Sequence, residues 1–268
     1  MAAIDTIASF QTTVGSALAA GVMATGDSAQ IRNHPQSAEA RLLAAYYDSV
    51  TNSEVWRVRS PLLHDNVQGI RFFPDEDPIA RLLPPYGLQR LHPQDELTFE
   101  FTTAAATGKA LGALLIYYSQ LPGAAARLFN PGDVLGLVKN VKPVIVSIAS
   151  GANTAGIWFD EAINADEDLL HANTDYAVLG ITTDLGVAAI AIKGIDTGNL
   201  RVGVPGTTRG EVNAGYFVDL SMATGLPCIP VINSANAGST FVSIISSAAT
   251  GAILNAGVIL AELSQNLS

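Results

Sequence analysis

The four histidines are the residues best suited to hold a metal ion, and they are scattered along the chain at His34, His64, His92 and His171. Metal-binding histidines often occur with one or three residues between them, because two ring nitrogens must reach the same ion. No such pair occurs in this sequence. We therefore expect the histidines to lie at solvent-facing turns, and we expect neither a metal site nor a bound cofactor.

Two acidic runs have the residue types that bind a cation. Asp75-Glu76-Asp77 precedes a proline, and Asp166-Glu167-Asp168 follows Asn164. The second run places oxygens at alternate positions, as a calcium loop does, but it lacks the glycine at the sixth position and the glutamate at the twelfth. A solvated loop or a helix N-terminus is the favoured interpretation, and an ion site is the alternative.

The sequence contains none of the short motifs that mark common enzyme sites. There is no Gly-x-Ser-x-Gly elbow, no phosphate-binding glycine loop and no nicotinamide fingerprint. Cys228 is the only cysteine and lies in an apolar run typical of a buried strand, so we predict a core thiol and no disulfide. The segment Asp196-Thr197-Gly198-Asn199 is typical of a turn. We predict that the protein is not an enzyme, and we assign no catalytic residue.

Aromatic residues could stack on sugar rings, and the candidates are Tyr46-Tyr47, Tyr117-Tyr118 and Trp158. Adjacent residues of a strand point to opposite faces, so only one tyrosine of each pair could face a ligand. We favour packing in the core or at a subunit interface, and a carbohydrate-binding face is the alternative.

Low charge is the main feature of the composition. Of the 268 residues, 49% are hydrophobic and only 14% are charged, below the roughly 25% usual for soluble chains. Such a surface suits burial against neighbouring subunits, although a well-packed secreted domain fits equally well. The net charge is −10, and the first thirty residues contain no Lys or Arg. Direct binding of nucleic acid is not expected, because that binding depends on neutralising phosphates.

Targeting and membrane segments are not evident. The N-terminus lacks the positive charge of a secretion signal, and no window has the length and apolarity of a transmembrane helix. We expect a protein that is soluble when it is made in the cytoplasm.

The first twenty residues have apolar side chains three and four positions apart. These side chains are Ile4, Ile7, Phe10, Val14 and Leu18. The spacing predicts an amphipathic helix, whose apolar face would dock on a partner subunit, on a membrane surface or on its own domain. The absence of basic residues argues against an anionic membrane. We assign these five residues to assembly.

After His34-Pro35 the pattern changes to the period of two that is typical of β-strands. Leu97 to Phe101 alternates cleanly, and Leu111 to Tyr118 is apolar enough for a strand buried on both sides. Further strands are predicted at 55–59, 69–73, 144–148, 156–159, 176–181, 188–192, 200–204, 216–220, 228–232, 241–245 and 256–263. A short helix is predicted at Pro131 to Lys139, and a loop or a second short helix at Asp160 to His171. The pattern predicts an all-β sandwich or barrel.

The chain also resembles itself at an offset of about 144 residues. The matches include Ala44-Ala45 with Ala188-Ala189, Arg57-Val58 with Arg201-Val202, Ala105-Ala106-Thr107-Gly108 with Ala248-Ala249-Thr250-Gly251, and Leu111 and Ala113 with Leu254 and Ala256. We interpret residues from about 40 to 121 and from about 184 to 267 as the same succession of strands, because they keep nearly one offset.

Two similar antiparallel barrels in one chain, each closed by the same kind of strand, resemble the double jelly-roll major capsid proteins of tailless icosahedral viruses. The resemblance implies two tandem jelly-roll-like barrels with an N-terminal helix and one or two short helices. It also implies homotrimeric capsomers with a pseudo-six-fold outline that tile a shell, often around a membrane. The domains expected are an N-terminal helical arm at 1–40, a first barrel at 41–128, a linker or helix at 129–142, and a second barrel at 143–268.

The function predicted on this basis is that of a self-assembling coat protein located in the virion. Its partners would be further copies of itself, together with other coat or membrane-associated virion proteins. The alternative is a ligand-binding or carbohydrate-binding β-sandwich module of an appendage or spike.

Overall fold

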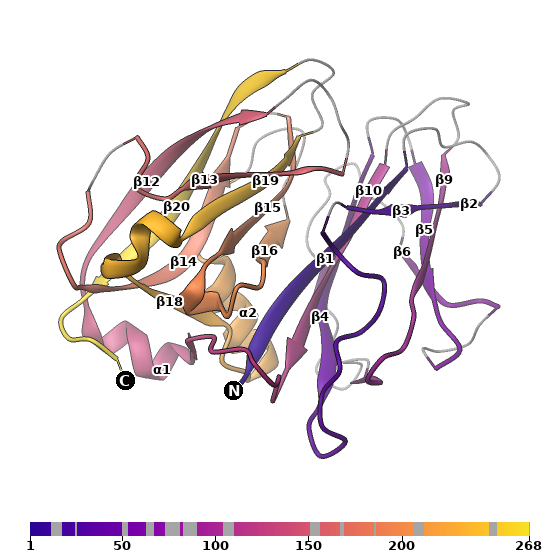
Figure 1. Ribbon diagram of the computed structural model, residues 1–268, viewed down its shortest axis with the longest axis horizontal. Helices are drawn as coiled ribbons and strands as arrows, with labels where there is room; N and C mark the ends of the chain where they lie inside the picture. The colour runs from indigo at the N-terminus through magenta and orange to yellow at the C-terminus, as the bar shows by residue number, and fades with distance from the viewer. Residues whose placement is uncertain are drawn as a thin grey trace.

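The computed structural model describes residues 1–11, 18–24, 26–49, 53–62, 67–72, 81–82, 90–103, 110–150, 156–166, 169–184, 186–205, 212–246 and 251–267. Two β-barrels stand side by side, and the second barrel follows the first along the chain (Figure 1).

Strands account for most of both barrels, and the helices among the described residues are short. The strands are β1 Ala3–Gln11, β2 Ala19–Ala20, β3 Val22–Met23, β4 Ala40–Ser49, β5 Ser53–Arg59, β6 Ile70–Phe72, β7 Arg81–Leu82, β8 Arg90–Leu91, β9 Thr98–Thr103, β10 Ala110–Tyr118, β11 Leu128–Phe129, β12 Val138–Ser150, β13 Trp158–Ala162, β14 Asp175–Thr183, β15 Val187–Lys193, β16 Val202–Pro205, β17 Val212–Asn213, β18 Ile229–Asn233, β19 Phe241–Ser246 and β20 Ala252–Leu263. The helices are α1 Pro131–Val134, α2 Tyr216–Thr224 and the 3-10 turns η2 Leu135–Leu137, η3 Ile195–Thr197 and η4 Ser234–Ser239. None of the described helices has the length and apolarity to span a bilayer.

Each barrel consists of two antiparallel sheets. In the first barrel the sheets have the orders β3-β1-β10-β4-β7, with β8 also on β4, and β2-β9-β5-β6. In the second they are β11-β18-β14-β20-β12, with β17 also on β14, and β13-β19-β15-β16. The chain passes back and forth between the two sheets of each barrel in the manner of a jelly roll. The predicted fold class of two tandem jelly-roll-like barrels is therefore confirmed.

The pairings define which strands of the two barrels are equivalent. The closing strands β10 and β20 are both central, and β10 lies between β1 and β4 as β20 lies between β12 and β14. In the second sheets, β9 lies between β2 and β5 as β19 lies between β13 and β15. The duplication therefore extends from the first strand of each half to the last.

The sequence alignment of the repeat was wrong in its first part by one strand. It placed Ala44-Ala45 of β4 on Ala188-Ala189 of β15, whereas the pairings make β14 the counterpart of β4. It likewise placed Arg57-Val58 of β5 on residues at the start of β16, although β15 is the counterpart of β5. Residues 105–108 and 248–250, the best match, lie outside the described residues. Strands of one class have similar compositions, so short identities do not distinguish neighbouring strands.

The closing strands were also matched one residue out of phase. A Cβ on Gly112 would meet the Trp56 ring of the first core, so Ala113 points the opposite way, toward the second barrel. Ala256, with which the sequence alignment matched Ala113, is fully buried and lies beside exposed Asn255, so it points into its own barrel. Ala113 points out of its own barrel, so the two residues are on opposite faces. A slip of one residue exchanges the two faces of a strand.

The predicted N-terminal helix was wrong, because these residues form strand β1. β1 pairs with β10 over its full length, from Ala3 opposite Tyr118 to Gln11 opposite Ala110. Ile7 belongs to the first core, whereas Ile4 belongs to the cluster of the second barrel, so both faces of the strand are buried. When both faces need apolar side chains, alternation disappears and a helical spacing can arise by coincidence. Phe10 is half-buried, Leu18 lies just before β2 with 39% of its surface exposed, and Val14 lies outside the described residues.

Three other predicted elements compare as follows. The strand predicted at 216–220 is wrong, because these residues form helix α2, which ends at Gly225 in a left-handed conformation (φ +69°). The predicted loop or helix at 160–171 begins instead as the end of β13. The short helix predicted from Pro131 is confirmed by α1 and η2.

Two apolar clusters fill the molecule. The first core surrounds Trp56, whose ring stacks on those of Phe99 and Phe101 at centroid distances of 6.0 and 6.3 Å. The second cluster fills the second barrel and continues onto the outer face of the first, through residues of β1 and β10 such as Ala8 and Leu115. The sheet β1-β10-β4 is thus covered on both faces, as predicted for the strand at 111–118, and it forms one wall between the barrels.

Candidate functional site

The contact between the barrels brings β1 of the first against β16 of the second. The Thr6 amide donates to the Arg201 carbonyl at 2.8 Å, and the Gly203 amide donates to Thr6 Oγ1 at 2.7 Å. A Cβ at position 203 would lie 2.7 Å from the same Thr6 oxygen. Glycine is therefore needed where the two strands approach each other.

Asp27 joins the two barrels through one buried carboxylate. Its Oδ2 accepts hydrogen bonds from the Ala8 amide at 2.8 Å and from Trp158 Nε1 at 3.2 Å, and its Oδ1 accepts from Arg201 Nη1 at 3.3 Å. Only 4% of the Asp27 side chain is exposed. Burial raises its pKa to about 6, although these bonds and the Arg201 charge act in the opposite direction. The Arg201 guanidinium also lies over the Trp158 ring, 4.9 Å from its centroid.

A second ion pair lies beside this one. Asp5, on β1, is almost completely buried and accepts a hydrogen bond from Nε of Arg32. Burial raises the pKa of Asp5, and the charge and hydrogen bond of Arg32 oppose that effect. The Arg32 amide donates to the Tyr118 hydroxyl at 3.2 Å, which positions this segment against β10.

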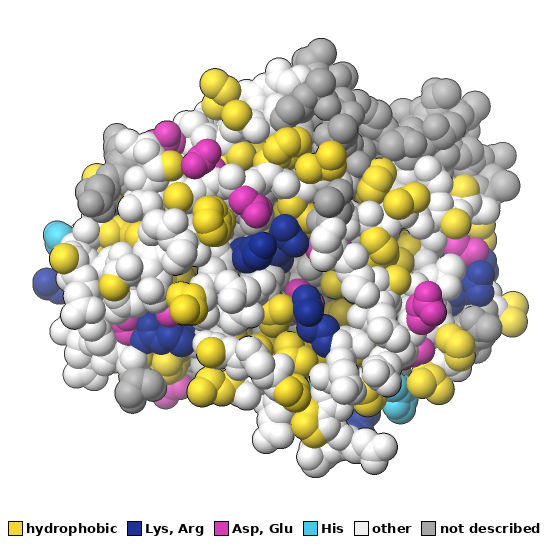
Figure 2. Space-filling model, viewed as in Figure 1, with side chains coloured by type: hydrophobic (Ala, Val, Ile, Leu, Met, Phe, Trp, Pro, Cys, Tyr) yellow, Lys and Arg dark blue, Asp and Glu magenta, His cyan; other side chains and the backbone are white. Residues whose placement is uncertain are grey.

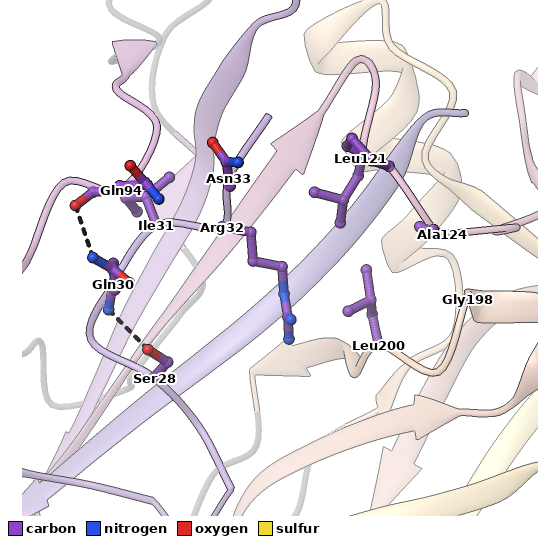
Figure 3. A pocket seen from close by; sticks show the side chains of 12 residues that line it. Ser28, Gln30, Ile31, Arg32, Asn33, Gln94, Leu121, Ala124, Gly198 and Leu200 are labelled. Carbon is purple, nitrogen blue, oxygen red and sulfur yellow. Dashed lines mark hydrogen bonds between the residues drawn. The ribbon is translucent and has the colours of Figure 1, made fainter. Parts of the chain in front are cut away.

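Two adjoining cavities open along this contact. The larger, of about 470 Å³, is lined by the segment around Arg32, by the linker after β10 and by Gly198 and Leu200 of the second barrel (Figure 3). The smaller, of about 130 Å³, lies next to the Asp27 and Arg201 pair. Both are lined by Ser28, Gln30, Arg32 and Leu200, so we call the two together the inter-barrel groove. Lys and Arg side chains gather in a hollow at the centre of the face in Figure 2.

Comparisons with known proteins found little. No protein-family model matches the chain, and no curated protein matches it in sequence. Among solved structures, the major capsid protein P2 from Bacteriophage PM2 is similar over 99% of both chains, with 10% identity and a TM-score of 0.22. A likeness this weak carries no argument about the function of this chain.

The histidines do not converge. His34 is buried, with Nδ1 3.1 Å from the Pro35 carbonyl and its ring against Tyr118, so its predicted solvent-facing position was wrong. His92 is exposed, His171 lies with Nδ1 3.0 Å from a Glu262 oxygen, and His64 lies outside the described residues. Within the part of the chain that the structure describes, no three His, Cys, Asp or Glu residues come together to hold a metal ion.

Of the two acidic runs, the structure describes only Asp166, which does not line the groove. Residues 75–77 and 167–168 lie outside the described residues, and the Asp166 carboxylate accepts a hydrogen bond from the Ser147 amide. The turn predicted at residues 196–199 is confirmed, with Gly198 at φ +67° after η3. Asp196 has an additional role there, because its carboxylate accepts from the Asn233 amide and the Asn236 side chain at 3.0 Å.

The aromatic candidates are buried. Tyr117, Tyr118 and Trp158 are 6%, 1% and 7% exposed, so they are core and interface residues, as favoured from the sequence. The side chains of Tyr46 and Tyr47 lie outside the described part. Cys228 is also buried, and burial raises the pKa of its thiol to about 12, which agrees with a core thiol.

The charged residues of the groove were not found from the sequence. Asp5 and Asp27 lie among small and apolar residues, and each meets a cation distant along the chain: Arg32 is 27 positions from Asp5, and Arg201 is 174 positions from Asp27. The absence of Lys and Arg from the first thirty residues is the one available signal, because it leaves Asp5 and Asp27 without a cation on their own segment.

Proposed function

We propose that this protein is a self-assembling structural coat protein of a virion, and that its chains join head to tail into trimers with a pseudo-six-fold outline. The observation that carries the proposal is a difference between two equivalent surfaces. The outer sheet face by which the first barrel contacts the second has an equivalent on the second barrel. No part of the described chain covers that equivalent face.

On the first barrel, the outer face of β1 and β10 is completely covered. Ile4, Ala8, Leu111, Ala113 and Leu115 are each at most 5% exposed, and they belong to the same apolar cluster as the second core. Residues of this kind are buried here because a second barrel lies on them.

On the second barrel, the equivalent face is formed by β12 and β20, and β12 is an edge strand. This bare face includes Val141 and Ile145 on β12 and Ile253 on β20, with 49%, 58% and 71% of their surfaces exposed. Alternation places Val144 and Val146 of β12 inward, so Val141 and Ile145 point outward and are apolar although the core does not require it. The paired Ser147 and Asn255 lie on the same face, between Ile145 and Ile253. Exposed apolar clusters of this kind mark surfaces that bind other proteins.

The surface of the second barrel that contacts β1 also has an equivalent on the first barrel. In the contact within the chain, the second barrel contributes β16, whose equivalent is the edge strand β6. Val67 and Leu62, which precede β6, are 76% and 54% exposed. A second copy placed with its β6 region on the bare face of β12 and β20 would repeat the contact that already exists inside the chain. Repeated head-to-tail contacts close into rings when the rotation allows it.

The remaining parts of the proposal follow from assembly. The two barrels at 41–128 and 143–268, joined by 129–142, would be the building blocks. Strands β1 to β3 are added to the first, because β1 pairs with β10, β2 with β9 and β3 with β1. The proposed location is the virion, where other coat or membrane-associated proteins would be neighbours. Direct contact with nucleic acid is not part of the proposal.

Light scattering after size-exclusion chromatography, followed by negative-stain electron microscopy of the same fraction, tests the proposal. We expect trimers or closed shells at micromolar concentration. A chain that stays monomeric over a wide range of concentration and ionic strength would overturn it.

A further inference from the structure

We propose that the inter-barrel groove binds a small carboxylate that carries several hydroxyl groups, the chemistry of a sugar acid. This site is separate from the bare face of β12 and β20, and it does not depend on assembly. The larger cavity has a volume of about 470 Å³, within the range of about 300–1,000 Å³ that is usual for sites that hold small molecules.

Arg32 provides the group that would hold the carboxylate. Its Nε is held by the buried Asp5, which orients the planar guanidinium. Its two Nη atoms make no hydrogen bond among the described residues, and 47% of the side chain is exposed. Figure 3 shows the guanidinium extending into the cavity, toward Leu200. A guanidinium fixed in this way can bind both oxygens of a carboxylate at once.

The charges around the groove favour a ligand with a single negative charge. Three cations line it, Arg32, Arg201 and Lys193, and two carboxylates, Asp5 and Asp27. Arg32 is paired with Asp5, and Arg201 with Asp27 and, at 4.0 Å, with Asp160, which does not line the groove. Among the lining residues, the charge of Lys193, which has no ion-pair partner in the described part of the chain, is therefore left over. A monoanion balances that charge, whereas a phosphate monoester would bring a second negative charge.

Uncharged polar side chains also line the larger cavity. Ser28, Gln30, Asn33 and Gln94 lie there, and Gln30 is held in place because its amide bonds to Ser28 Oγ at 3.1 Å and its Nε2 to the Gln94 carbonyl at 3.2 Å. Amide and hydroxyl groups both donate and accept hydrogen bonds, which suits the hydroxyl groups of a sugar. Ile31, Leu121 and Leu200 supply apolar surface, and Leu121 and Leu200 lie across the cavity from the polar side chains (Figure 3), as in most small-molecule sites.

Calorimetric titration of the full chain with glucuronate, glucose and acetate tests the proposal. We expect saturable binding of glucuronate, and binding at least tenfold weaker for both glucose and acetate, because each lacks one of the two recognised features. Undetectable binding of glucuronate at millimolar concentration would overturn the proposal. Acetate binding as tight as glucuronate binding would overturn the assignment to a polyhydroxylated ligand.

Variants locate the binding. Arg32→Gln should weaken glucuronate binding at least tenfold, and Arg32→Lys several-fold, because lysine keeps the charge and the pair with Asp5 but loses the fork. Arg41→Gln is the matched control, since Arg41 is also paired with a carboxylate, Glu39, and does not line the groove. An equal loss in Arg41→Gln would contradict the assigned site.

Asn33→Ala and Gln94→Ala keep the test decisive if Arg32→Gln does not fold, because both side chains are exposed at the groove. Each should weaken glucuronate binding and leave the weak acetate binding unchanged. Binding of glucuronate that is unaffected in both variants would contradict the proposal.

Discussion

Asp27 is the residue on which the contact between the barrels most depends. Its carboxylate accepts hydrogen bonds from β1 and from two side chains of the second barrel, Trp158 and Arg201, and it is almost completely buried. A buried charge is tolerated only when partners replace the water that it has lost. Its elevated pKa shows that these partners compensate for the loss of water only in part.

The pKa of Asp27 predicts how stability depends on pH. Because the folded protein binds this proton more tightly than the unfolded chain does, the contribution of Asp27 to the free energy of unfolding is greatest below about pH 4 and is lost as the pH rises through about 6. Asp27→Asn should remove this component, so that the difference in stability between wild type and variant changes between these two pH values. Urea unfolding at several pH values measures it.

The stability of Asp27→Asn must be compared with that of wild type at each pH, because other carboxylates also contribute to the pH dependence. Burial also raises the pKa of Asp5, whereas ion-pair and hydrogen-bond partners outweigh burial and lower those of Glu100, Asp175 and Glu262. Met222→Ala, at an exposed position on α2 with no titratable group, is the control and should leave the pH dependence unchanged. A difference between wild type and Asp27→Asn that is the same at every pH would contradict the prediction.

At Gly112, the addition of a single Cβ atom should affect the stability of the first core. A Cβ there would lie 2.3 Å from an atom of the Trp56 ring, which is fully buried. Gly112→Ala should lower the free energy of unfolding by about 1–3 kcal/mol, the usual effect of overpacking a core. Gly132→Ala in α1, where a Cβ meets nothing within 4 Å, is the control and should leave stability nearly unchanged. Equal stability of the two variants in urea would show that the Trp56 site is not tightly packed.

Among the elements, β1 and β12 occupy the same place in the two barrels but face different surroundings. β1 is buried on both sides, whereas β12 has one inward face and one outer face on which the apolar Val141 and Ile145 are exposed. An edge strand with exposed apolar residues readily pairs with other chains unless a partner covers it. The difference between the two strands is what the assembly proposal explains.

A charge on the exposed face of β12 should prevent assembly without unfolding the barrel. Ile145→Asp should reduce trimers to monomers in light scattering while changing the free energy of unfolding by no more than about 0.5 kcal/mol, as for other surface substitutions. Ile195→Asp is the matched control, because Ile195 is 53% exposed and lies in η3, outside β12 and β20. Trimers that persist in Ile145→Asp but are lost in Ile195→Asp would move the interface away from β12.

At the scale of the whole molecule, the two barrels share one apolar cluster and are joined by the ion pair of Asp27 with Arg201. Arg127, which lies between β10 and β11, donates to both oxygens of Asp175 at 3.0 and 2.6 Å and to the Leu267 carbonyl at 2.7 Å, so the connection is held against the second barrel. Extensive burial between units couples their unfolding, in contrast to domains that touch only through small polar surfaces.

We therefore expect a single thermal unfolding transition for both barrels. Arg201→Ala, which leaves the Asp27 carboxylate buried without its cation, should lower the free energy of unfolding by about 2–3 kcal/mol. In a double-mutant cycle, combination with Asp27→Asn should be clearly less destabilising than the sum of the two single changes. Two separate calorimetric transitions in the wild-type protein would contradict the coupling.

The sequence by itself determined the fold class and the strands with a clear pattern. Leu97 to Phe101 alternates because one face of β9 meets the first core and the other carries residues such as Glu100, and α1 begins at a proline after Asn130. These signals are local, because each depends on what lies on the two sides of one segment.

Only the tertiary structure decided the nature of β1, the register of the repeat and the inter-barrel groove. β1 loses its alternation because the second barrel covers its outer face, and no local pattern reports that contact. Asp27 and Arg201 meet only when two complete barrels pack together, although they are 174 positions apart. Long-range packing therefore set which residues form the groove, whereas local burial patterns set the strands that carry them.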